Sequence, residues 1–391
     1  MIEQVKDPGS ESFSIAREFG ELLKARIQKD PTFYLFSPDE TTSNKLDAVY
    51  DVAARAWSLP QKSWDLPEAA DGRIVELLSE NSLFAMMVGH VLNGEPAMMT
   101  SYESFFTVIN SQVAQQIKFL KQAEAIAWRP KYPAINLLST STCWRQDHNG
   151  FSHQSPVMIS SLLSLPSNKV NCLFPVDDVA AEVCFDFMMK SENVVNLTTF
   201  DKNLNPRWID GYHAKFQFDN GGASVFKFAS DDEPEIILTA AGDIVTRETL
   251  RAMEILRADA PEIKMRFVGI NALSYNAIGT TENKLSQAKF DELFMTDKPI
   301  VANFHGYPET LRGILAQYTD IRRVSAHGFM EEGSTTTPME MLAMNGASRY
   351  DIAADVANRM GREDLAEKYR QVIAENHDYA LMFGVDKIEL N

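Results

Sequence analysis

The stretch Val170-Asn-Cys-Leu-Phe-Pro-Val-Asp-Asp-Val-Ala-Ala-Glu-Val-Cys-Phe-Asp-Phe-Met-Met-Lys-Ser-Glu-Asn-Val-Val-Asn-Leu197 decides the fold class. Its two apolar ends predict buried strands, and Val176–Met189 between them has the length and composition of a helix. Asp177 or Asp178 stands where it can cap that helix. Strands that alternate with helices in this way are typical of a mostly parallel sheet covered by helices on both faces.

The same alternation continues on both sides of this stretch. Further strands are predicted at Phe33–Phe36, Ile74–Leu78, Ala97–Met99, Ala134–Leu138, Ile236–Ala240, Met265–Ile270, Pro299–Phe304 and Arg323–Ala326. Helices are predicted at Ser104–Ile126, Thr246–Leu256, 310–318 and over most of Pro338–Tyr379. We therefore predict an α/β protein of two domains, residues 1–208 and 234–391, joined by a polar, glycine-containing linker at 209–233. Within the linker, a hairpin and a helix-to-strand connection both remain possible.

Composition narrows the function classes. A chain of 391 residues with 45% hydrophobic residues can bury a large core, and its net charge of −17 opposes a nucleic-acid or anionic-membrane surface. The three cysteines show neither paired spacing nor an even count, which favours a reducing compartment. The start of the chain is polar and acidic, and the most apolar window, Leu83–Leu92, is too short to cross a bilayer. These features predict a cytoplasmic protein.

The segment Cys143-Trp-Arg-Gln-Asp-His-Asn-Gly-Phe-Ser-His-Gln154, called the polar loop below, follows a predicted strand. A glycine-punctuated polar loop at a strand end is where α/β proteins usually present catalytic groups. His148 and His153 can exchange protons near neutral pH or donate to an anion beside Arg145. A metal site is disfavoured because no third ligand stands at a recognisable spacing. The histidines could also simply hold the loop together.

Two further candidates are not specific when each is taken alone. Glu80 follows the predicted strand Ile74–Leu78, where a solvated acid is also common. Tyr102 and Phe105 lie beside a predicted helix start, where aromatic residues more often belong to the core.

In combination and order, however, these segments resemble phosphoketolase, the thiamine-diphosphate lyase that cleaves xylulose 5-phosphate or fructose 6-phosphate with inorganic phosphate. The matching segments are Phe36–Asn44, Gly72-Arg73 with Leu78–Glu80, Ser101–Phe105, Trp144–Gln154, Phe304–Pro308 and Glu331–Pro338. The resemblance covers essentially the whole chain but only the C-terminal half of the family's sequence. It implies the pyrimidine-binding and C-terminal domains of a transketolase-like enzyme, without the domain that binds the cofactor's diphosphate and Mg²⁺.

The resemblance also implies roles for individual residues. Glu80 matches the glutamate that hydrogen-bonds the aminopyrimidine ring, and Tyr102 and Phe105 match the aromatic residues that hold this ring. His148 and His153 match histidines that face the substrate and shuttle protons. Residues implied in binding hydroxyl or phosphate oxygens are Ser43, Lys45, Gln146, Asn149 and Lys202. The chain departs from the family pattern at Lys45, where arginine is common, and at Asn81, where histidine is usual.

Three functions follow as hypotheses. The first is part of a phosphoketolase that makes acetyl phosphate and an aldose phosphate in pentose phosphate metabolism, completed by the N-terminal half as a homo- or hetero-oligomer and inactive when isolated. The second is a non-catalytic paralogue that binds a full-length enzyme. The third is a subunit of a split transketolase-like enzyme. The polar loop favours phosphoketolase over transketolase.

Overall fold

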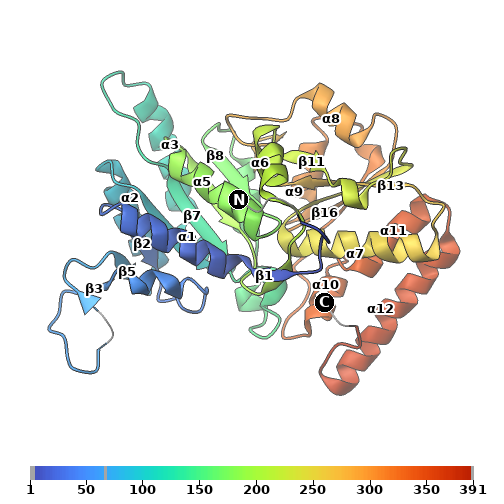
Figure 1. The fold of residues 1–391 in the computed structure, drawn as a ribbon, viewed down its shortest axis with the longest axis horizontal. Coiled ribbons are helices and arrows are strands. Elements are labelled where there is room, and N and C mark those ends of the chain that lie inside the picture. The colour runs from blue at the N-terminus through green and yellow to red at the C-terminus, as the bar shows by residue number, and fades with distance from the viewer. Residues whose placement is uncertain (1–4, 66–67, 389–391) are drawn as a thin grey trace.

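The computed structural model describes residues 5–65 and 68–388, and its two main sheets lie side by side (Figure 1). In spatial order the strands of the first sheet are β15 (Ala277–Ile278), β14 (Ala272–Ser274), β8 (Val170–Leu173), β9 (Val195–Thr199), β7 (Ile135–Thr140), β6 (Ala97–Tyr102), β2 (Tyr34–Ser37), β5 (Ile74–Glu76), β3 (Arg55–Ala56) and β4 (Glu68–Ala69). Neighbouring strands from β8 to β4 are parallel, whereas β14 and β15 are antiparallel additions. The predicted mostly parallel sheet is confirmed.

Helices cover both faces of the first sheet. They are α1 (Ile15–Lys29), α2 (Glu80–Leu92), α3 (Asn110–Glu124), α4 (Val157–Ser164) and α5 (Asp178–Lys190). The side chains of β7 alternate between the two faces: Leu137 packs with α2, α3 and α4, whereas Leu138 packs with α1 and α5. Every residue of the strand is therefore buried, including the polar residues Asn136, Ser139 and Thr140.

The second sheet is smaller, and residues from the C-terminal half of the chain build it. Its strands are β11 (Ala223–Val225), β13 (Met265–Ile270), β12 (Ile236–Ala241), β16 (Ile300–Phe304) and β17 (Val324–His327). The helices of this region are α6 (Gly211–Asp219), α7 (Asp243–Asp259), α8 (Gln287–Phe294), α9 (Pro308–Leu315), α10 (Pro338–Met344), α11 (Arg349–Arg359) and α12 (Glu363–Phe383). A separate antiparallel pair, β1 (Ser12–Ser14) and β10 (Leu204–Pro206), connects the start of α1 with the chain before α6.

The structure confirms the predicted cap and corrects three local expectations. Asp177 caps α5, because its carboxylate accepts a hydrogen bond of 2.8 Å from Ala180 N. Glu80 does not end a strand; it is the first residue of α2, which Ser79 caps. The segment predicted as a linker contains α6 followed by β11, so the helix-to-strand connection is correct and the hairpin is wrong. The residues of β14 and β15 were not predicted as strands, yet they extend the first sheet.

The apolar window Leu83–Leu92 lies in α2, whose buried face includes Leu83, Met87 and Val91. These side chains pack in the core of the first sheet. Among the described residues, no helix has both the length and the apolar character that a membrane crossing requires. All three cysteines are buried and unpaired.

Candidate active site

The predicted site residues lie in segments that follow the carboxyl ends of parallel strands in the first sheet. Ligands of open α/β sheets usually bind at this edge. The candidates are Ser43 and Lys45 after β2, Glu80 after β5, Tyr102 and Phe105 at the end of β6, Gln146, His148, Asn149 and His153 after β7, and Lys202 after β9. Because these strands are neighbours, residues far apart in the chain meet here.

Five of the candidates contact one another and are called the site cluster: Ser43, Tyr102, Phe105, His153 and Lys202. The rings of Tyr102 and Phe105 stack with centroids 5.8 Å apart, and the His153 ring lies 5.0 Å from that of Phe105. Lys202 Nζ lies 4.8 Å from the centre of the Tyr102 ring. The Tyr102 hydroxyl donates to Ser43 Oγ at 3.1 Å. The structure therefore brings together aromatic, basic and hydroxyl groups that the sequence places up to about 160 residues apart.

Glu40 belongs to the same place and was missed by the sequence analysis. It is only 9% exposed, and one carboxylate oxygen accepts a hydrogen bond of 2.9 Å from the backbone N–H of Tyr102. Burial raises its pKa to about 7, and the nearby charge of Glu80 acts in the same direction. The only sequence signal was its place in the segment Phe36–Asn44. In that segment Glu40 could not be distinguished from an ordinary acidic residue in a turn after a strand.

Electrostatic coupling links the carboxyl groups to the basic side of the site. Burial lowers the pKa of Lys202, while the negative charge of Glu40 partly offsets this effect. Burial also lowers the pKa of His153, and the positive charges of His148 and Lys202 add to the shift. His153 is therefore readily neutral near neutral pH and can accept a proton, and Glu40 can carry one in the same pH range.

The polar loop orients its side chains in two directions. His148 and Asn149 are exposed, and the Asn149 amide lies 3.3 Å from His148 Nε2. Gln146 is fully buried, and its Oε1 accepts a hydrogen bond of 2.5 Å from Asn149. Gln146 thus holds Asn149 by a hydrogen bond, whereas His148 and Asn149 are exposed and accessible to a ligand.

Three residues beside this edge adopt left-handed backbone conformations that are rare outside glycine. Their φ angles are 64° for Asp39, 63° for Lys45 and 51° for Ser141. Ser141 Oγ donates to Asn44 Oδ1 at 2.9 Å, which ties the segment after β7 to the segment after β2. Strained backbone of this kind concentrates at functional sites, where surrounding contacts hold it in place.

A potential metal-ligand group forms elsewhere among the described residues, from Glu103, Cys143 and His305. Their side chains are buried, and Glu103 accepts hydrogen bonds from His305 Nε2 at 2.8 Å and from Cys143 N at 2.7 Å. These donors already use both carboxylate oxygens. The carboxylate is thus satisfied by protein groups, and the thiol and imidazole are unlike the oxygen ligands that Mg²⁺ prefers.

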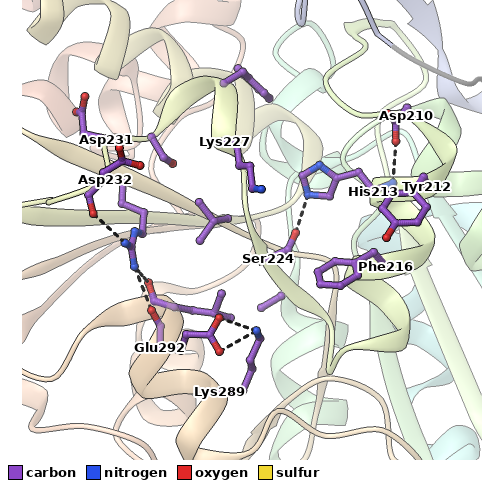
Figure 2. A pocket seen from close by; sticks show the side chains of 16 residues that line it. Asp210, Tyr212, His213, Phe216, Ser224, Lys227, Asp231, Asp232, Lys289 and Glu292 are labelled. Carbon is purple, nitrogen blue, oxygen red and sulfur yellow. Dashed lines mark hydrogen bonds and ion pairs between the residues drawn. The ribbon is translucent and has the colours of Figure 1, made fainter.

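A cavity of about 800 Å³ lies at the edge of the second sheet, between α6, β11 and α8 (Figure 2). Aromatic and charged side chains of both signs line it, among them Tyr212, Phe216, Lys227, Asp232 and Glu292. No residue of the site cluster lines this cavity. It is therefore separate from the predicted site.

Comparison with known proteins identifies the family. Residues 17–191 match the model for D-xylulose 5-phosphate/D-fructose 6-phosphate phosphoketolase, and residues 202–391 match the model for the C-terminal domain of the same family. The chain belongs to the phosphoketolase family. A probable phosphoketolase from Nitrosospira multiformis is 33% identical over 395 residues, which cover 98% of this chain and 49% of that protein. The phosphoketolase homology region thus spans about half the length of the curated relatives that it matches.

Solved structures show the same fold in transketolases. A transketolase from Pichia stipitis, in complex with sedoheptulose 7-phosphate, matches with a TM-score of 0.71 and 15% identity over 92% of this chain and 47% of that chain. A split-gene transketolase described as an inactive β4 tetramer matches with a TM-score of 0.61 and 15% identity, and the match covers 90% of this chain and 99% of that chain. At these identities the comparison establishes the α/β fold of transketolase-like enzymes, which was predicted from the sequence.

Proposed function

We propose that this phosphoketolase homologue supplies the pyrimidine-binding half of an enzyme that cleaves xylulose 5-phosphate or fructose 6-phosphate with inorganic phosphate, giving acetyl phosphate and an aldose phosphate. The observation that carries the proposal is the site cluster beside the two carboxyl groups of Glu40 and Glu80. It joins an aromatic platform, proton carriers and cations at the ligand-binding edge of the sheet.

The residues fit the pyrimidine ring of thiamine diphosphate, the cofactor that would supply carbanion stabilisation when bound. The stacked rings of Tyr102 and Phe105 offer apolar faces, and both are only half-buried. Aromatic stacking contributes about 0.5–1.5 kcal/mol beyond the burial of area. Glu80, at the start of α2, would hydrogen-bond a ring nitrogen.

Glu40 can hold a proton near neutral pH, and the nearby charge of Glu80 favours this protonation. Their charges repel, and Glu40 is buried with a pKa of about 7. A proton on Glu40 would limit the negative charge around Glu80, which would hydrogen-bond the cofactor ring. The backbone N–H of Tyr102 fixes the orientation of Glu40 for this task.

The remaining candidate residues would hold the substrate. Lys202 and Lys45 supply positive charge and Ser43 a hydroxyl for a phosphate group, and Asn149 would orient oxygen atoms of the sugar. His153 and His148 would move protons to and from substrate oxygens. The lowered pKa of His153 favours its neutral form, which accepts a proton.

The described residues fit the cofactor's diphosphate and Mg²⁺ less well than its pyrimidine ring. Among residues 5–65 and 68–388, the potential metal-ligand group of Glu103, Cys143 and His305 is buried and consists partly of nitrogen and sulfur ligands. We therefore propose that the other half of the family sequence, on a partner subunit, binds these groups. A split-gene transketolase chain has the same fold over nearly its full length. That same match makes a subunit of a split transketolase-like enzyme the second candidate.

Three wider features are part of the proposal. We divide the chain into domains at residues 1–208 and 234–391, with 209–233 between them, in keeping with family models that end at 191 and begin at 202. We expect an oligomer in which the site is completed by the second half. The three unpaired, buried cysteines are compatible with the cytoplasm.

The decisive experiment combines this chain with the part of the Nitrosospira multiformis protein that it does not cover, and measures acetyl phosphate from xylulose 5-phosphate and inorganic phosphate. We expect activity in the mixture, and a fall of ~10²–10⁴-fold for Glu80→Gln, because the amide cannot carry the proton. Glu254→Gln is the control, since Glu254 is an exposed acid on α7 that pairs with Arg251. An active Glu80→Gln mixture would contradict the role of Glu80.

Cofactor binding gives a readout that does not depend on turnover. Calorimetry with thiamine diphosphate and Mg²⁺ should show little binding to the isolated chain and clear binding to the mixture. Micromolar binding by the isolated chain would place the diphosphate site within it, against the proposal. Assembly without any cofactor binding would favour the non-catalytic paralogue, and two-carbon transfer between sugar phosphates without acetyl phosphate would favour the transketolase-like subunit.

A further inference from the structure

The polar loop is held from outside its own sheet. At its start, Trp144 Nε1 donates to the carbonyl oxygen of His305 at 2.9 Å. In its middle, the carbonyl oxygen of Asp147 accepts from Thr336 N at 2.9 Å, and at its end Gln154 Nε2 donates to the carbonyl oxygen of Ser334 at 2.9 Å. His305 follows β16 of the second sheet, and the other two partners lie before α10. The C-terminal region thus contacts the loop at three points.

One of these points contains a buried pair of titratable side chains. Glu103 and His305 are 2% and 0% exposed, and His305 Nε2 lies 2.8 Å from Glu103 Oε1. Burial lowers the pKa of His305, but the negative charges of Glu103, Asp243 and Asp201 outweigh it and raise the pKa above its ordinary value. The hydrogen bond between Glu103 and His305 joins segments that follow strands of the two sheets, 202 residues apart in the chain.

The same pair holds both functional segments. Glu103 follows Tyr102 of the site cluster, and its second oxygen accepts from Cys143 N, the first residue of the polar loop, at 2.7 Å. Gly242 allows His305 to approach, since a Cβ at this glycine would lie 2.7 Å from His305 Cβ. The side chain of Glu103 and the backbone of His305 thus bind two consecutive loop residues, Cys143 and Trp144, from opposite sides.

We propose that Glu103 and His305 are positioning residues: their hydrogen-bonded pair clamps the polar loop between the two sheets and fixes His148 and His153 relative to Tyr102 and Phe105. The C-terminal region then acts in the reaction without contributing a side chain to the site cluster. The link to turnover rests on the proposed function, whereas the clamp itself is a property of this chain. Buried groups that hydrogen-bond one another are suited to this role, because removing one leaves its partners unpaired in the core.

The test measures hydrogen–deuterium exchange of loop peptides in the full chain. The loop amides are measurable because several are bonded, such as Arg145 N to the carbonyl of Thr142 at 3.0 Å and His153 N to that of Gly150 at 3.1 Å. Glu103→Ala should speed their exchange by ~10-fold or more, as expected for loss of a charge-assisted hydrogen bond. Glu103→Gln should restore most of the protection, because its amide oxygen can accept from Cys143 N while its NH₂ donates to neutral His305.

Glu248→Ala is the matched control. Glu248 is also a fully buried glutamate in an ion pair, 2.8 Å from Arg349 Nε, but it lies between α7 and α11. The Glu248→Ala variant should lower the global melting temperature without selectively speeding hydrogen–deuterium exchange in the polar loop. Equal loop exchange in wild type and Glu103→Ala, or equal acceleration by Glu248→Ala, would overturn the clamp.

Two further arms keep the result decisive. If Glu103→Ala does not fold, Trp144→Phe removes the indole N–H bond to His305 together with part of a buried ring that packs on Phe329, and should speed loop exchange by ~2–10-fold; no change would refute the clamp. If EDTA loosens the wild-type loop and Zn²⁺ restores it, a metal ion bound to Glu103, Cys143 and His305 holds the loop instead of the hydrogen-bonded pair. That result would overturn the proposal. In the active mixture, Glu103→Ala should lower kcat more than it changes KM for phosphate. An inactive wild-type mixture would refute the proposed function but leave the exchange result valid.

Discussion

Glu40 beside the site cluster and Glu248 of α7 are both buried, yet their surroundings act on them in opposite ways. Burial raises the pKa of Glu40 to about 7, with Glu80 adding repulsion. Burial also acts to raise the pKa of Glu248, but hydrogen bonds and charges from Arg349 and Arg247 outweigh it, and the pKa falls below its ordinary value. A buried carboxyl group without an arginine can carry a proton, whereas one held by arginines is a fixed structural charge.

A similar contrast separates the basic side chains of the two regions. In the second-sheet region, His327 pairs with Asp355, which also accepts from Arg359 at 3.1 Å. At the carboxyl edge of the first sheet, Lys202 lies over the aromatic ring of Tyr102, and His153 Nδ1 hydrogen-bonds Ser152 Oγ at 2.9 Å. Among the described residues, neither Lys202 nor His153 forms an ion pair within the fold, whereas His327 and Asp355 do.

The largest expected effect concerns His148 and His153 of the polar loop. His153→Asn in the two-part mixture should reduce acetyl phosphate formation by ~10²–10⁴-fold, because Asn cannot exchange a proton near neutral pH. Its melting temperature should change little, since His153 is only partly buried. His148→Asn should behave similarly. Assays and thermal melts on the same samples check both statements.

His213→Asn provides the control for these variants. His213 is a partly buried histidine of α6 that bonds Ser224 Oγ at 2.8 Å and lines the cavity of Figure 2, away from the site cluster. It should leave turnover of the folded protein unchanged. If His148→Asn and His153→Asn instead lose stability while the folded fraction keeps its normal activity, the histidines only brace the loop.

The next largest effect concerns protein stability, on which substitutions of Glu248 and Glu40 should act differently. At pH 8, Glu248→Gln should lower the free energy of unfolding by about 3–5 kcal/mol, because it leaves Arg349 and Arg247 partly uncompensated in the core. Glu40→Gln should cause no loss, since the neutral amide can still accept from Tyr102 N and no longer repels Glu80. Urea denaturation of the isolated chain measures both values. Similar losses for the two variants would remove the distinction between them.

The pH dependence of Glu40 sharpens this point. Its folded pKa, about 7, lies above the ordinary value of 4.5, so the folded state binds the proton more tightly than the unfolded state. The stabilisation is complete below pH 4.5 and disappears as the pH rises through 7. Wild type should therefore lose up to ~3 kcal/mol relative to Glu40→Gln between pH 5 and 8. Parallel stability curves for the two proteins would show that Glu40 is ionised throughout.

The sequence predicted more of the fold than of the chemistry. Long apolar runs such as Ala134–Leu138 fixed the main strands, because burial on both faces leaves a clear pattern. The strands β14 and β15 are too short for such a pattern, and their pairing depends on the distant β8. The resemblance to phosphoketolase supplied Tyr102, His153 and Lys202, whose contacts the structure then showed.

Two features of the site could not be read from one sequence. Glu40 stands in a turn-like segment, and its raised pKa comes from burial against Tyr102 and from the charge of Glu80, both set by tertiary packing. The Glu103–His305 pair joins residues 202 positions apart, for which local spacing gives no signal. Both depend on how the segments after parallel strands meet, which topology decides and local propensity does not.

The smallest expected effect belongs to a paired histidine of the second-sheet region. Burial lowers the pKa of His327, but Asp355 outweighs it and raises the pKa, while the pKa of Asp355 falls to about 2. The contribution of His327 is complete below its unfolded pKa near 6.5 and is lost as the pH rises through the folded value; that of Asp355 is present above pH 3.8 and lost toward pH 2. His327→Gln should therefore cost about 1–2 kcal/mol at pH 5.5 and less at pH 9. His377→Gln, which breaks the more exposed pair with Glu340, should cost less at pH 5.5. A loss for His327→Gln that stays constant from pH 5.5 to 9 would mean that the histidine stabilises β17 by packing, because only a charged pair responds to its own titration.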